Sequence, residues 1–344
     1  MSNAVRSKIT IKQVAEASGV APSTVSNALT GKGYVSEETR GRVLQAAQSL
    51  GYRASSLARS LRLQQTWSVG LLVADVSNPF FPAVVRGVED VLWRRQYNLV
   101  LCNTDYNKEK EAAYLRHLLD KRLDGLILAS TAADSDDVLE LQAEGVPFVM
   151  LNRRHVSART PYVGMDNEGG VGMAMDHLLA LGHRRIAFIK GRADSSAAEE
   201  RHQGYRQALE REAIAYDPAL VMQGDYTIES GHAAAARFLA LRRPPTAIVS
   251  ANDFMAFGAM ALFKERGLAV PSEMSVIGFD DIFVSALPWI ELTTVRPQSW
   301  QLGASAAELL LELVGGREAN RRREIILPNE LVLRATTAPA RPER

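Results

Sequence analysis

The sequence predicts a small all-α head followed by an α/β body of two doubly wound lobes, each built on a parallel sheet. Three observations lead to this fold class. Short amphipathic segments fill the first 52 residues, the net charge changes sign soon after them, and from residue 66 onward apolar runs alternate with helical segments. The 344 residues are enough for two or three domains of ordinary size.

The composition is typical of a globular chain, with 47% apolar and 23% charged residues. The single cysteine, Cys102, lies in the apolar run NLVLC; it excludes a disulfide framework and indicates a core residue in a reducing compartment. No apolar stretch approaches the ~18 residues of a membrane span, and the N-terminus lacks the apolar segment of a signal peptide. We therefore expect a cytoplasmic protein.

Charge is unevenly distributed along the chain. Residues 1–65 carry nine Lys and Arg against three Glu, a net charge of +6, whereas the rest of the chain carries −5. A basic segment on a mildly acidic body suggests a polyanionic partner for that segment alone. Chance clustering of surface Lys and Arg gives the same count, so the argument depends on the motifs that accompany it.

The first helix is expected over Ile11 to Ser18. Thr10 followed by Gln13 has the form of a capping box at its start. Gly19 is placed to end it, because glycine readily adopts the left-handed conformation of a helix C-terminus. Apolar residues at helical spacing give this helix one buried face.

A second helix, over residues 20–29, follows after a short turn. Pro22 lies in its first turn, where a helix tolerates proline best. Its buried stripe is expected to consist of Val25, Ala28 and Leu29. Its other face has small side chains without charge, namely Pro22, Ser23, Thr24, Ser26 and Asn27. With no carboxylate, His or Cys, this face is unsuited to acid–base or metal chemistry.

A third helix is expected between Ser36 as N-cap and Gly51 as its stop, with Val43, Leu44, Ala47 and Leu50 on its buried face. Three short helices with a tight turn before the second make a helix-turn-helix head over residues 1–52. Residues 53–65 form a hinge helix or linker. Its segment ASSLARSLR is amphipathic but too short to be a stable helix alone in water.

The body, over residues 66–338, contains seven clear strand candidates. Continuous apolar runs separated by helices indicate parallel sheets that are covered on both faces. The number of units exceeds one ordinary sheet, so we expect a first lobe over about 66–164 and 294–318 and a second over about 165–291 and 321–338, with a flexible tail at 339–344. The strands are SVGLLVAD, YNLVLCN, DGLILAS, PFVMLN, RRIAFIK, TAIVSAN and MSVIGFD.

Polar side chains follow the predicted strands, and in doubly wound sheets ligands bind beyond the carboxyl ends of the strands. Amide, carboxylate and guanidinium groups together suit a hydroxyl-rich ligand, and aromatic side chains offer faces for a ring. Alternatively a strand-end Asp or Asn caps the next helix, the favoured interpretation for Asp75 and Asp105. The polar candidates are Asn78, Asn152, Arg153, Arg201, Asn252, Asp253 and Asp280; the aromatic ones are Phe80, Phe81, Tyr226 and Trp289.

Enzyme signatures are weak. GGVGMAM at Gly169–Met175 lacks the third glycine of a dinucleotide-binding loop and does not directly follow a good strand. There is no GxSxG motif, no Walker loop and no His or Cys spacing for a metal, and His183 in LGHRR is interpreted as structural. We expect no enzyme activity, no cofactor and no metal site.

Several motifs occur in one order along nearly the whole chain: the head from Thr10 to Leu61, then VGLLVADVSNPFF, LGHRRIAFI, RHQGYRQAL, SANDFMAFGAM, VPSEMSVIGFDD and LTTVRPQ. In this arrangement the sequence resembles the LacI/GalR family of transcriptional repressors. The resemblance implies a body with two lobes like those of periplasmic binding proteins. It also shows that Ala21 replaces the hydroxyl residue usual at the N-cap of the second helix, a change that costs about 1 kcal/mol of helix stability.

For DNA, the resemblance implies a homodimer with its second helices in successive major grooves of a pseudo-palindromic operator. Ser23 and Asn27 would read bases, Pro22 would only pack, and Lys and Arg would hold phosphates. Leu61 would wedge into the minor groove with its dimer mate. The tail has no leucine heptads, so a dimer is expected. The DNA-contacting set is Thr10, Pro22, Ser23, Thr24, Ser26, Asn27, Ala58, Leu61 and Arg62.

For the effector, positions matching Asn152, Arg201, Asn252 and Asp280 contact the ligand in sugar-responsive relatives, and Arg201 and Asp253 match contacts in purine-responsive ones. Asn152 departs from the Asp often found there. We expect a repressor controlled by a sugar or sugar derivative, either inducer or corepressor; a purine-type effector is the alternative. A solute-binding protein without DNA function is disfavoured by the basic head. The effector set is Asn78, Phe80, Asn152, Arg153, Arg201, Tyr226, Asn252, Asp253 and Asp280.

Overall fold

The computed structural model describes residues 9–30, 33–52, 65–316 and 322–341. The chain divides into two compact units, residues 1–66 and residues 67–344. The three hinge residues predicted to contact DNA, Ala58, Leu61 and Arg62, lie outside the described residues.

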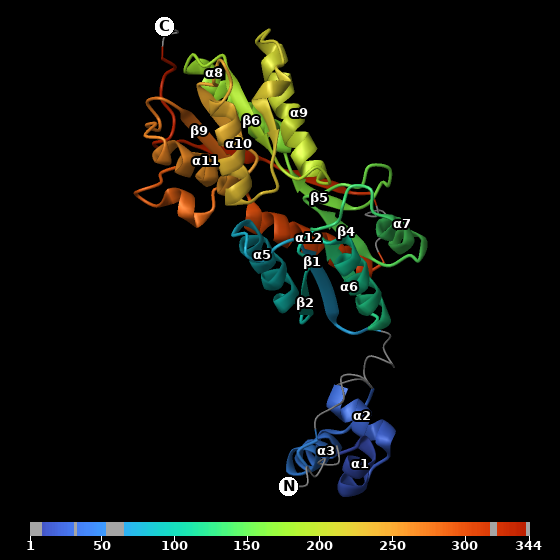
Figure 1. The fold of residues 1–344 in the computed structure, drawn as a ribbon. Helices are drawn as coiled ribbons and strands as arrows, with labels where there is room; N and C mark the ends of the chain where they lie inside the picture. The colour runs from blue at the N-terminus through green and yellow to red at the C-terminus, as the bar shows by residue number, and fades with distance from the viewer. Residues whose placement is uncertain (1–8, 31–32, 53–64, 317–321, 342–344) are drawn as a thin grey trace, which may run out of the picture. The chain divides into compact units, whose positions relative to one another are not determined.

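The head contains the three expected helices (Figure 1), which are α1 (Ile11–Ser18), α2 (Pro22–Thr30) and α3 (Glu37–Ser49). At the start of α1, the Gln13 side chain accepts the backbone N–H of Thr10 at 2.8 Å, as a capping box requires. The Ser36 hydroxyl accepts the backbone N–H of Thr39 at 3.3 Å and caps α3. The predicted starts of the first and third helices are therefore confirmed, whereas the second helix, expected over residues 20–29, begins at Pro22 and ends at Thr30.

The core of the head is built from small side chains, mostly valine and alanine. Leu44 is not part of it, since 49% of its surface is exposed, and its predicted burial is wrong. The spacing explains why: residues 43, 46 and 47 share one face of α3, and residue 44 is turned by about 100° from residue 43. The buried set is Val14, Ala15, Val25, Ala28, Val43, Ala46 and Ala47.

The first lobe of the body is a six-stranded parallel sheet in the order β11-β5-β4-β3-β1-β2. Alternate side chains of β1 enter different cores: Leu71 packs on the side of α5 and α12, and Leu72 on the side of α6 and α7. The strands are β1 (Ser68–Val73), β2 (Asn98–Asn103), β3 (Gly125–Leu128), β4 (Phe148–Leu151), β5 (Tyr162–Met165) and β11 (Glu324–Leu327); the helices are α5 (Phe80–Arg94), α6 (Lys108–Asp120), α7 (Asp136–Ala143) and α12 (Ser299–Val314).

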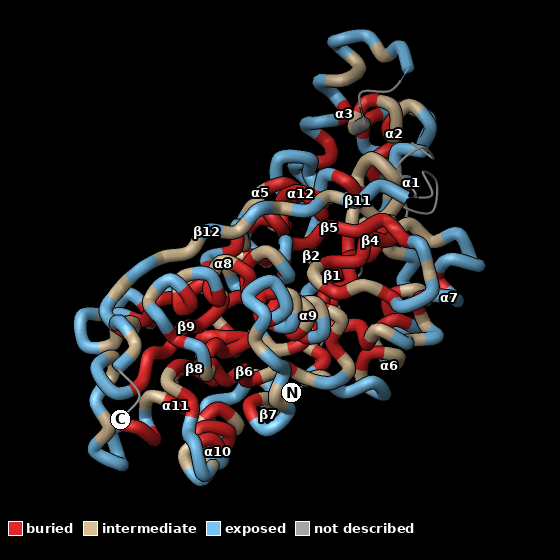
Figure 2. The backbone as a smooth tube through the Cα atoms, turned by 90° about the horizontal axis from the view of Figure 1, so that it is seen from above, coloured by how far each residue is buried: buried red, intermediate tan, exposed pale blue. Residues whose placement is uncertain are grey.

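The second lobe is a six-stranded sheet in the order β12-β10-β9-β8-β6-β7, parallel except for β12, which runs antiparallel to β10. The inner strands of both lobes are largely buried (Figure 2), whereas the edge strands β2, β7, β11 and β12 are mostly exposed or half-buried. The strands are β6 (Ile186–Lys190), β7 (Val221–Gln223), β8 (Ala247–Ser250), β9 (Ser275–Phe279), β10 (Thr293–Pro297) and β12 (Asn329–Val332); the helices are α8 (Asn167–Ala180), α9 (Ser196–Arg211), α10 (Ile228–Leu239) and α11 (Asp253–Glu265), with 3-10 turns at Pro218–Leu220 and Phe283–Ala286.

The chain passes between the lobes three times, after β5, after β10 and after β11. The predicted lobe boundaries are wrong at two places, because β10 belongs to the second sheet and β11 to the first. Strand partners distant in sequence decide this pairing, and apolar patterning does not reveal them. Side chains join the crossings: Asn329 donates to the Asp166 carbonyl at 2.6 Å, and Gln298 donates to the Pro328 carbonyl at 3.4 Å.

Helices α5 and α12 approach each other closely through two glycines. A Cβ at Gly87 would overlap the carbonyl oxygen of Trp300, and a Cβ at Gly303 would overlap the carbonyl oxygen of Val84. Only glycine permits backbones to come this close. The contact fixes the position of α5, whose first residues, Phe80 and Phe81, reach the cavity described below.

The end of the chain is held against the second lobe. The backbone N–H of Ala340 donates to the Leu181 carbonyl at 2.8 Å. The predicted flexible tail therefore begins too early, since residue 340 is still bonded, and residues 342–344 are outside the description. Within the described ranges, no helix combines the length and the apolar character that crossing a bilayer requires.

Candidate functional site

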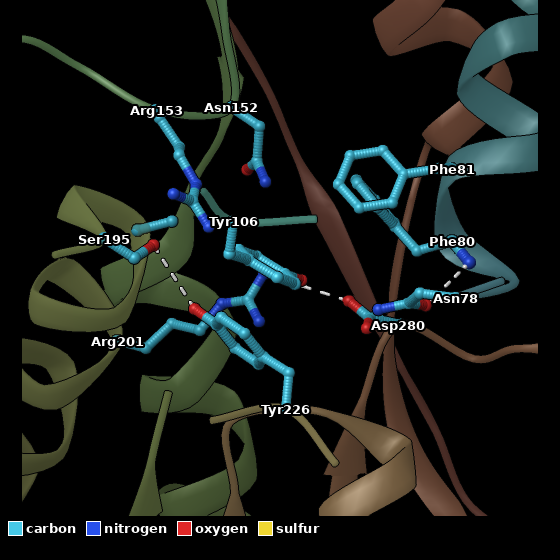
Figure 3. Close-up of a pocket in the computed structure, with 11 residues that line it drawn as sticks. Asn78, Phe80, Phe81, Tyr106, Asn152, Arg153, Ser195, Arg201, Tyr226 and Asp280 are labelled. Carbon is cyan, nitrogen blue, oxygen red and sulfur yellow. Dashed lines mark hydrogen bonds and ion pairs between the residues drawn. The ribbon is translucent and has the colours of Figure 1, made fainter. Parts of the chain in front are cut away.

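A cavity lies between the two lobes of the body, with about 380 Å³ of space, part of which is open to solvent (Figure 3). Its residues follow the carboxyl ends of strands in both sheets, where ligands bind in doubly wound folds. The first lobe contributes Asn78, Phe80, Phe81, Tyr106, Asn152 and Arg153; the second contributes Ser195, Ala197, Arg201, Tyr226 and Asp280.

Seven of the nine residues predicted to bind the effector line this cavity. Asn252 and Asp253 do not, because their side chains are used inside the second lobe. Asn252 caps α11 by accepting the Met255 N–H at 3.0 Å. Asp253 accepts hydrogen bonds from the hydroxyls of Ser285 and Thr294, both at 2.6 Å. Asn252 thus follows the capping alternative, whereas Asp253 binds groups of other segments in its own lobe.

Three further strand-end or loop candidates also lie apart from the cavity-lining set. Asp75 accepts the Ser77 hydroxyl at 2.7 Å and holds a local turn. Asp105 pairs with Lys110 at 2.5 Å, which lowers the pKa of that carboxyl. Trp289 is 77% exposed and does not line the cavity. Neither Asp75 nor Asp105 caps the next helix as predicted, since the N-caps of α5 and α6 are Pro79 and Asn107.

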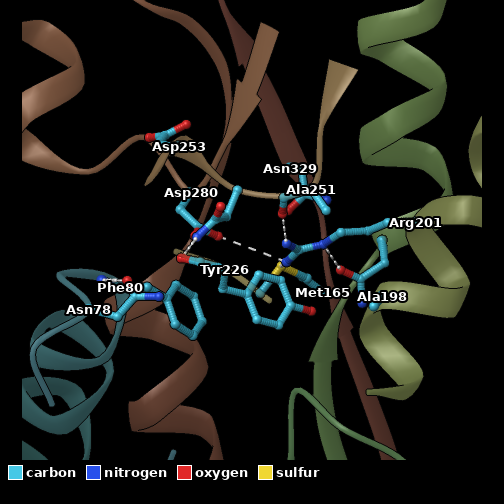
Figure 4. Close-up of polar contacts among 12 residues, drawn as sticks. Asn78, Phe80, Met165, Ala198, Arg201, Tyr226, Ala251, Asp253, Asp280 and Asn329 are labelled. Carbon is cyan, nitrogen blue, oxygen red and sulfur yellow. Dashed lines mark hydrogen bonds and ion pairs between the residues drawn. The ribbon is translucent and has the colours of Figure 1, made fainter. Parts of the chain in front are cut away.

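Arg201 is the most enclosed cation of the site, with 3% of its surface exposed. Its Nε donates to Asn167 at 2.8 Å, another guanidinium nitrogen donates to the Ala251 carbonyl, and the group lies 3.7 Å from the ring centroid of Phe279 (Figure 4). A carboxylate oxygen of Asp280 lies 3.8 Å from it. Arg201 therefore connects the second sheet, α8 and the cavity, and holds a charge at the cavity wall.

Asp280 is a buried carboxyl at the cavity. Burial raises its pKa to about 8 even though the Arg201 guanidinium favours the charged form. The ion pair of 3.8 Å is longer than a charge-assisted hydrogen bond, so the cost of desolvation dominates. Burial also raises the pKa of nearby Asp253, to about 7. The second lobe thus keeps two carboxyls that can carry protons near neutral pH.

Four residues of the cavity wall have left-handed backbone conformations that non-glycine residues rarely adopt. The φ angles are 56° at Tyr106, 62° at Asn152, 75° at Tyr226 and 113° at Asp280. Such conformations persist only where the surrounding structure enforces them, and they concentrate at functional sites. They turn each side chain out of its strand direction and into the space between the lobes.

Tyr106 and Tyr226 come from different lobes and face each other. Their ring centroids are 6.4 Å apart and the ring planes differ by 25°. Three residues that line the cavity were not predicted from the sequence, namely Tyr106, Ser195 and Ala197. Tyr106 directly follows Asp105 after β2, and Ser195, after β6, caps α9 by accepting the Ala198 N–H. Their positions after the ends of strands could have indicated both residues.

The residues considered for enzyme chemistry have structural roles. His183 is buried and contacts the hydroxyls of Thr246 at 2.8 Å and Ser275 at 3.1 Å. Burial lowers its pKa, so the neutral ring is favoured. Gly169–Met175 lies inside α8 and not in a loop after a strand. No cluster of His, Cys, Asp and Glu among the described residues has the arrangement of a metal site.

In the head, the second helix presents the expected face. Pro22 and Ser23 are exposed, and Thr24, Ser26 and Asn27 are half-buried. The Ala21 carbonyl accepts the N–H of Val25 at 3.1 Å, which makes Ala21 the N-cap of α2. Thr10 is exposed at the start of α1. The six described residues of the predicted DNA-contacting set thus lie in the first two helices of a helix-turn-helix.

A basic helix-turn-helix head with a two-lobed, ligand-binding body defines a DNA-binding regulator that responds to a small molecule. Residues 10–55 match the bacterial regulatory proteins of the lacI family, and residues 66–334 match the periplasmic binding proteins and sugar binding domain of the LacI family. The chain belongs to the LacI family of transcriptional regulators. It is a DNA-binding repressor and not an enzyme.

Similar proteins cover nearly the whole chain. The HTH-type transcriptional repressor PurR of Photobacterium profundum is 35% identical over 328 residues, 94% of this chain and 97% of the relative. A transcriptional regulator CelR–cellobiose complex is 31% identical with a TM-score of 0.74, covering 95% of this chain and 99% of the other. The Lac repressor dimer bound to operator and the anti-inducer ONPF is 29% identical with a TM-score of 0.87, covering 96% and 99%.

Proposed function

We propose that the protein is a homodimeric repressor whose affinity for a pseudo-palindromic operator is controlled by a sugar or sugar derivative in the cavity between the lobes. The observation that carries the proposal is the composition of the cavity wall. Both lobes contribute polar groups and aromatic faces to it, so one ligand can contact both lobes at once. The related CelR complex contains cellobiose, a sugar.

The polar groups suit hydroxyls. In the described part of the chain, the Oδ1 atom of Asn152 is buried and has no hydrogen-bond partner. A ligand hydroxyl that donates to it removes the cost of a buried unpaired acceptor. Asp280 and Arg201 offer an acceptor and donors on the opposite wall, and Tyr226 offers a flat face for a sugar ring.

Control of DNA binding follows from contacts with both lobes. A ligand that binds one arrangement of the lobes better than another shifts the population toward that arrangement. If that arrangement disfavours operator binding, the ligand is an inducer; if it favours operator binding, the ligand is a corepressor. The coupling is reciprocal, so operator DNA must change the affinity for the ligand by the same factor.

On DNA, Asn27 and Ser23 of α2 would read base edges and the basic side chains of the head would bind phosphates. Leu61 remains the proposed minor-groove wedge. We expect Leu61→Ala to lose most operator binding while ligand binding stays unchanged. Electrophoretic mobility shifts that give the parent affinity in this variant would contradict the wedge.

The homodimer is supported by exposed apolar side chains on the body. Trp93 is 75% exposed, Val100 and Leu101 of the edge strand β2 are 36% and 42% exposed, and Phe283 is 74% exposed. Trp93 lies on α5, the helix that contacts β2, and a contiguous exposed apolar surface marks an interaction site. Sedimentation equilibrium should give a dimer, and a monomer at micromolar concentration would contradict this part of the proposal.

The main test is a thermal-shift screen of the full chain with sugars, sugar acids, polyols and nucleobases, followed by operator-binding titrations with each hit. We expect a sugar or sugar derivative both to raise the melting temperature and to change operator affinity. Asp280→Ala should abolish the ligand response and retain operator binding. Release of the variant from DNA at the parent ligand concentration would refute this site.

A purine-type effector is the second candidate, and the Tyr106–Tyr226 pair favours it. The two rings lie at the cavity with centroids 6.4 Å apart and offer flat faces on which a planar base can stack. The related PurR repressor also covers nearly the whole chain. Nucleobases in the same screen decide: a nucleobase that shifts the melting temperature and operator affinity, with no sugar doing so, replaces the sugar proposal.

A further inference from the structure

Arg153 is a buried cation of the cavity wall without a countercharge. Only 4% of its surface is exposed. One guanidinium nitrogen donates to the Ser130 carbonyl at 3.0 Å, and the group lies 5.5 Å from the ring centroid of Tyr106. In the part of the chain that the structure describes, no carboxylate forms an ion pair with Arg153. Burying a guanidinium without a countercharge is costly.

The other arginines nearby are paired. Arg192 binds both carboxylate oxygens of Asp194 at 3.0 Å. Arg154 lies 3.2 Å from a carboxylate oxygen of Glu200 and 2.8 Å from one of Glu324. Arg153 therefore differs from these two arginines both in its burial and in having no ion pair among the described residues.

Two acids lie close enough to Arg153 for its charge to favour their ionised forms, but neither forms an ion pair with it in the described part of the chain. Asp194 is bonded to Arg192. Glu111 is buried and accepts the Ser130 hydroxyl at 2.6 Å, and burial raises the pKa of its carboxyl. Asn152, the residue before Arg153, is an amide without charge. The cavity-lining set thus contains two guanidinium groups and the single carboxyl of Asp280.

A second positive element lies on the same wall. Helix α9 spans 16 residues, and its N-cap Ser195 and its residue Ala197 both line the cavity. The first turn of such a helix carries a partial positive charge. Figure 3 shows the Arg153 guanidinium and the Ser195 hydroxyl on the same side of the cavity. The positive groups of the two lobes therefore converge on one region.

We infer that the effector carries a carboxylate or phosphate group, and that Arg153 binds this group beside the N-terminus of α9. The effector is then a sugar acid or a sugar phosphate. This inference rests on the proposed function, because it assigns a ligand class to the same cavity. Both a carboxylate and a phosphate can accept two hydrogen bonds from one guanidinium, and the remaining hydroxyls of the ligand contact Asn152 and Asp280.

Matched ligands test the inference on the full chain by isothermal titration calorimetry. Each set contains a neutral sugar, its uronate and its terminal phosphate: galactose, galacturonate and galactose 6-phosphate, and the same for glucose, with ribose and ribose 5-phosphate as a pair. In at least one set we expect a charged member to bind about tenfold or more tighter than its neutral parent. The uronate and phosphate arms separate the two sources of charge.

Three variants locate the effect. Arg153→Met removes the charge with little loss of length, and it should reduce the preference for the charged ligand about tenfold or more. Arg154→Met, at the adjacent but ion-paired residue, is the control and should leave that preference unchanged. Asn152→Asp places a carboxylate beside Arg153 and should also lower the preference for the charged ligand. This variant provides the test if Arg153→Met fails to fold.

The outcomes separate the inference from the proposed function. If the neutral sugars bind as tightly as their charged derivatives, the inference of an anionic effector is wrong, and the proposal that the cavity binds a sugar is retained. If no sugar in any form binds at about 10 mM, both the anionic effector and the proposed sugar effector are contradicted. If Arg153→Met and Asn152→Asp both keep the parent preference for a charged ligand, the assignment of Arg153 is wrong.

Discussion

The head and the body use opposite kinds of surface. The head has a small core of Val and Ala side chains, and its helix α2 presents exposed or half-buried groups without charge. The body has a large core, and its cavity wall contains buried charges and strained backbone. The difference teaches that the head can recognise a partner with its outer face alone, whereas the body has to enclose its ligand between two lobes.

The two regions should therefore respond differently to mutation. A change in the head alters DNA binding or the stability of a small core, and a change in the body alters ligand binding or the stability of a large one. Four substitutions test this separation.

Gly303→Val should destabilise the body by about 4 kcal/mol or more, because its Cβ would overlap the Val84 carbonyl and force α5 away from α12. The first residues of α5 line the cavity, so ligand binding should be lost too. Calorimetry of the full chain should show a lower melting temperature for the body and an unchanged transition for the head. A parent-like transition for the body would show that the helices tolerate separation.

Asp280→Asn should remove part of the pH dependence of body stability. Because the pKa of Asp280 rises from its ordinary 3.8 to about 8 on folding, the folded state binds this proton more tightly, and the stabilisation is full below about pH 4 and lost as the pH rises to about 8. Asn resembles the protonated form, so the variant should melt at least about 3 °C higher than the parent at pH 8.

Melting curves at closely spaced pH values check this prediction. Asp253, whose pKa is raised to about 7, titrates in the same window, so the variant should keep a smaller decline. A variant whose melting temperature falls with pH as steeply as that of the parent would show that Asp280 is ionised throughout.

Asn27→Ala should weaken binding to the preferred operator by about 1–3 kcal/mol per half-site contact, since an Asn side chain can form two hydrogen bonds to an adenine edge. Selection from a random DNA library measures the effect directly. The preference should relax at one base position in each half-site, and ligand affinity should not change. An unaltered sequence preference would remove Asn27 from base reading.

Ala21→Ser should stabilise the head by about 1 kcal/mol, because it adds a side-chain acceptor at the N-cap of α2. The body should be unaffected. Chemical denaturation followed by head-specific amide exchange measures the change, with Ala21→Val as a control that adds bulk without a hydroxyl. Equal stabilities of the Ser variant and the parent would show that solvent already satisfies the first turn.

Features that depend on a few neighbouring residues could be predicted from the sequence, whereas those that depend on distant segments could not. The helix caps at Thr10, Gly19 and Ser36 are local, and their chemistry is visible over three or four residues. The seven apolar strands were found for the same reason. The lobe membership of β10 and β11 was not, because it depends on partners distant in the chain.

The site was predicted in part. Residues such as Asn152 and Asp280 were found because polar groups after buried strands are informative in doubly wound folds. Asn252 and Asp253 occupy equivalent positions, but hydrogen bonds from their own lobe hold them away from the cavity. Only the three-dimensional arrangement separates these two cases, and only it shows that Arg153 has no ion pair with a carboxylate among the residues that the structure describes.

The three crossings between the lobes also bear on how the body is made. The first sheet begins with β1 at Ser68, yet its edge strand β11 comes only at Glu324–Leu327, after nearly all of the second lobe. During synthesis the sheet of the first lobe therefore stays incomplete, with the edge of β5 unpaired, until the segment that contains β11 has left the ribosome. The head has no such dependence. It can fold, and begin to search DNA, before the body is complete.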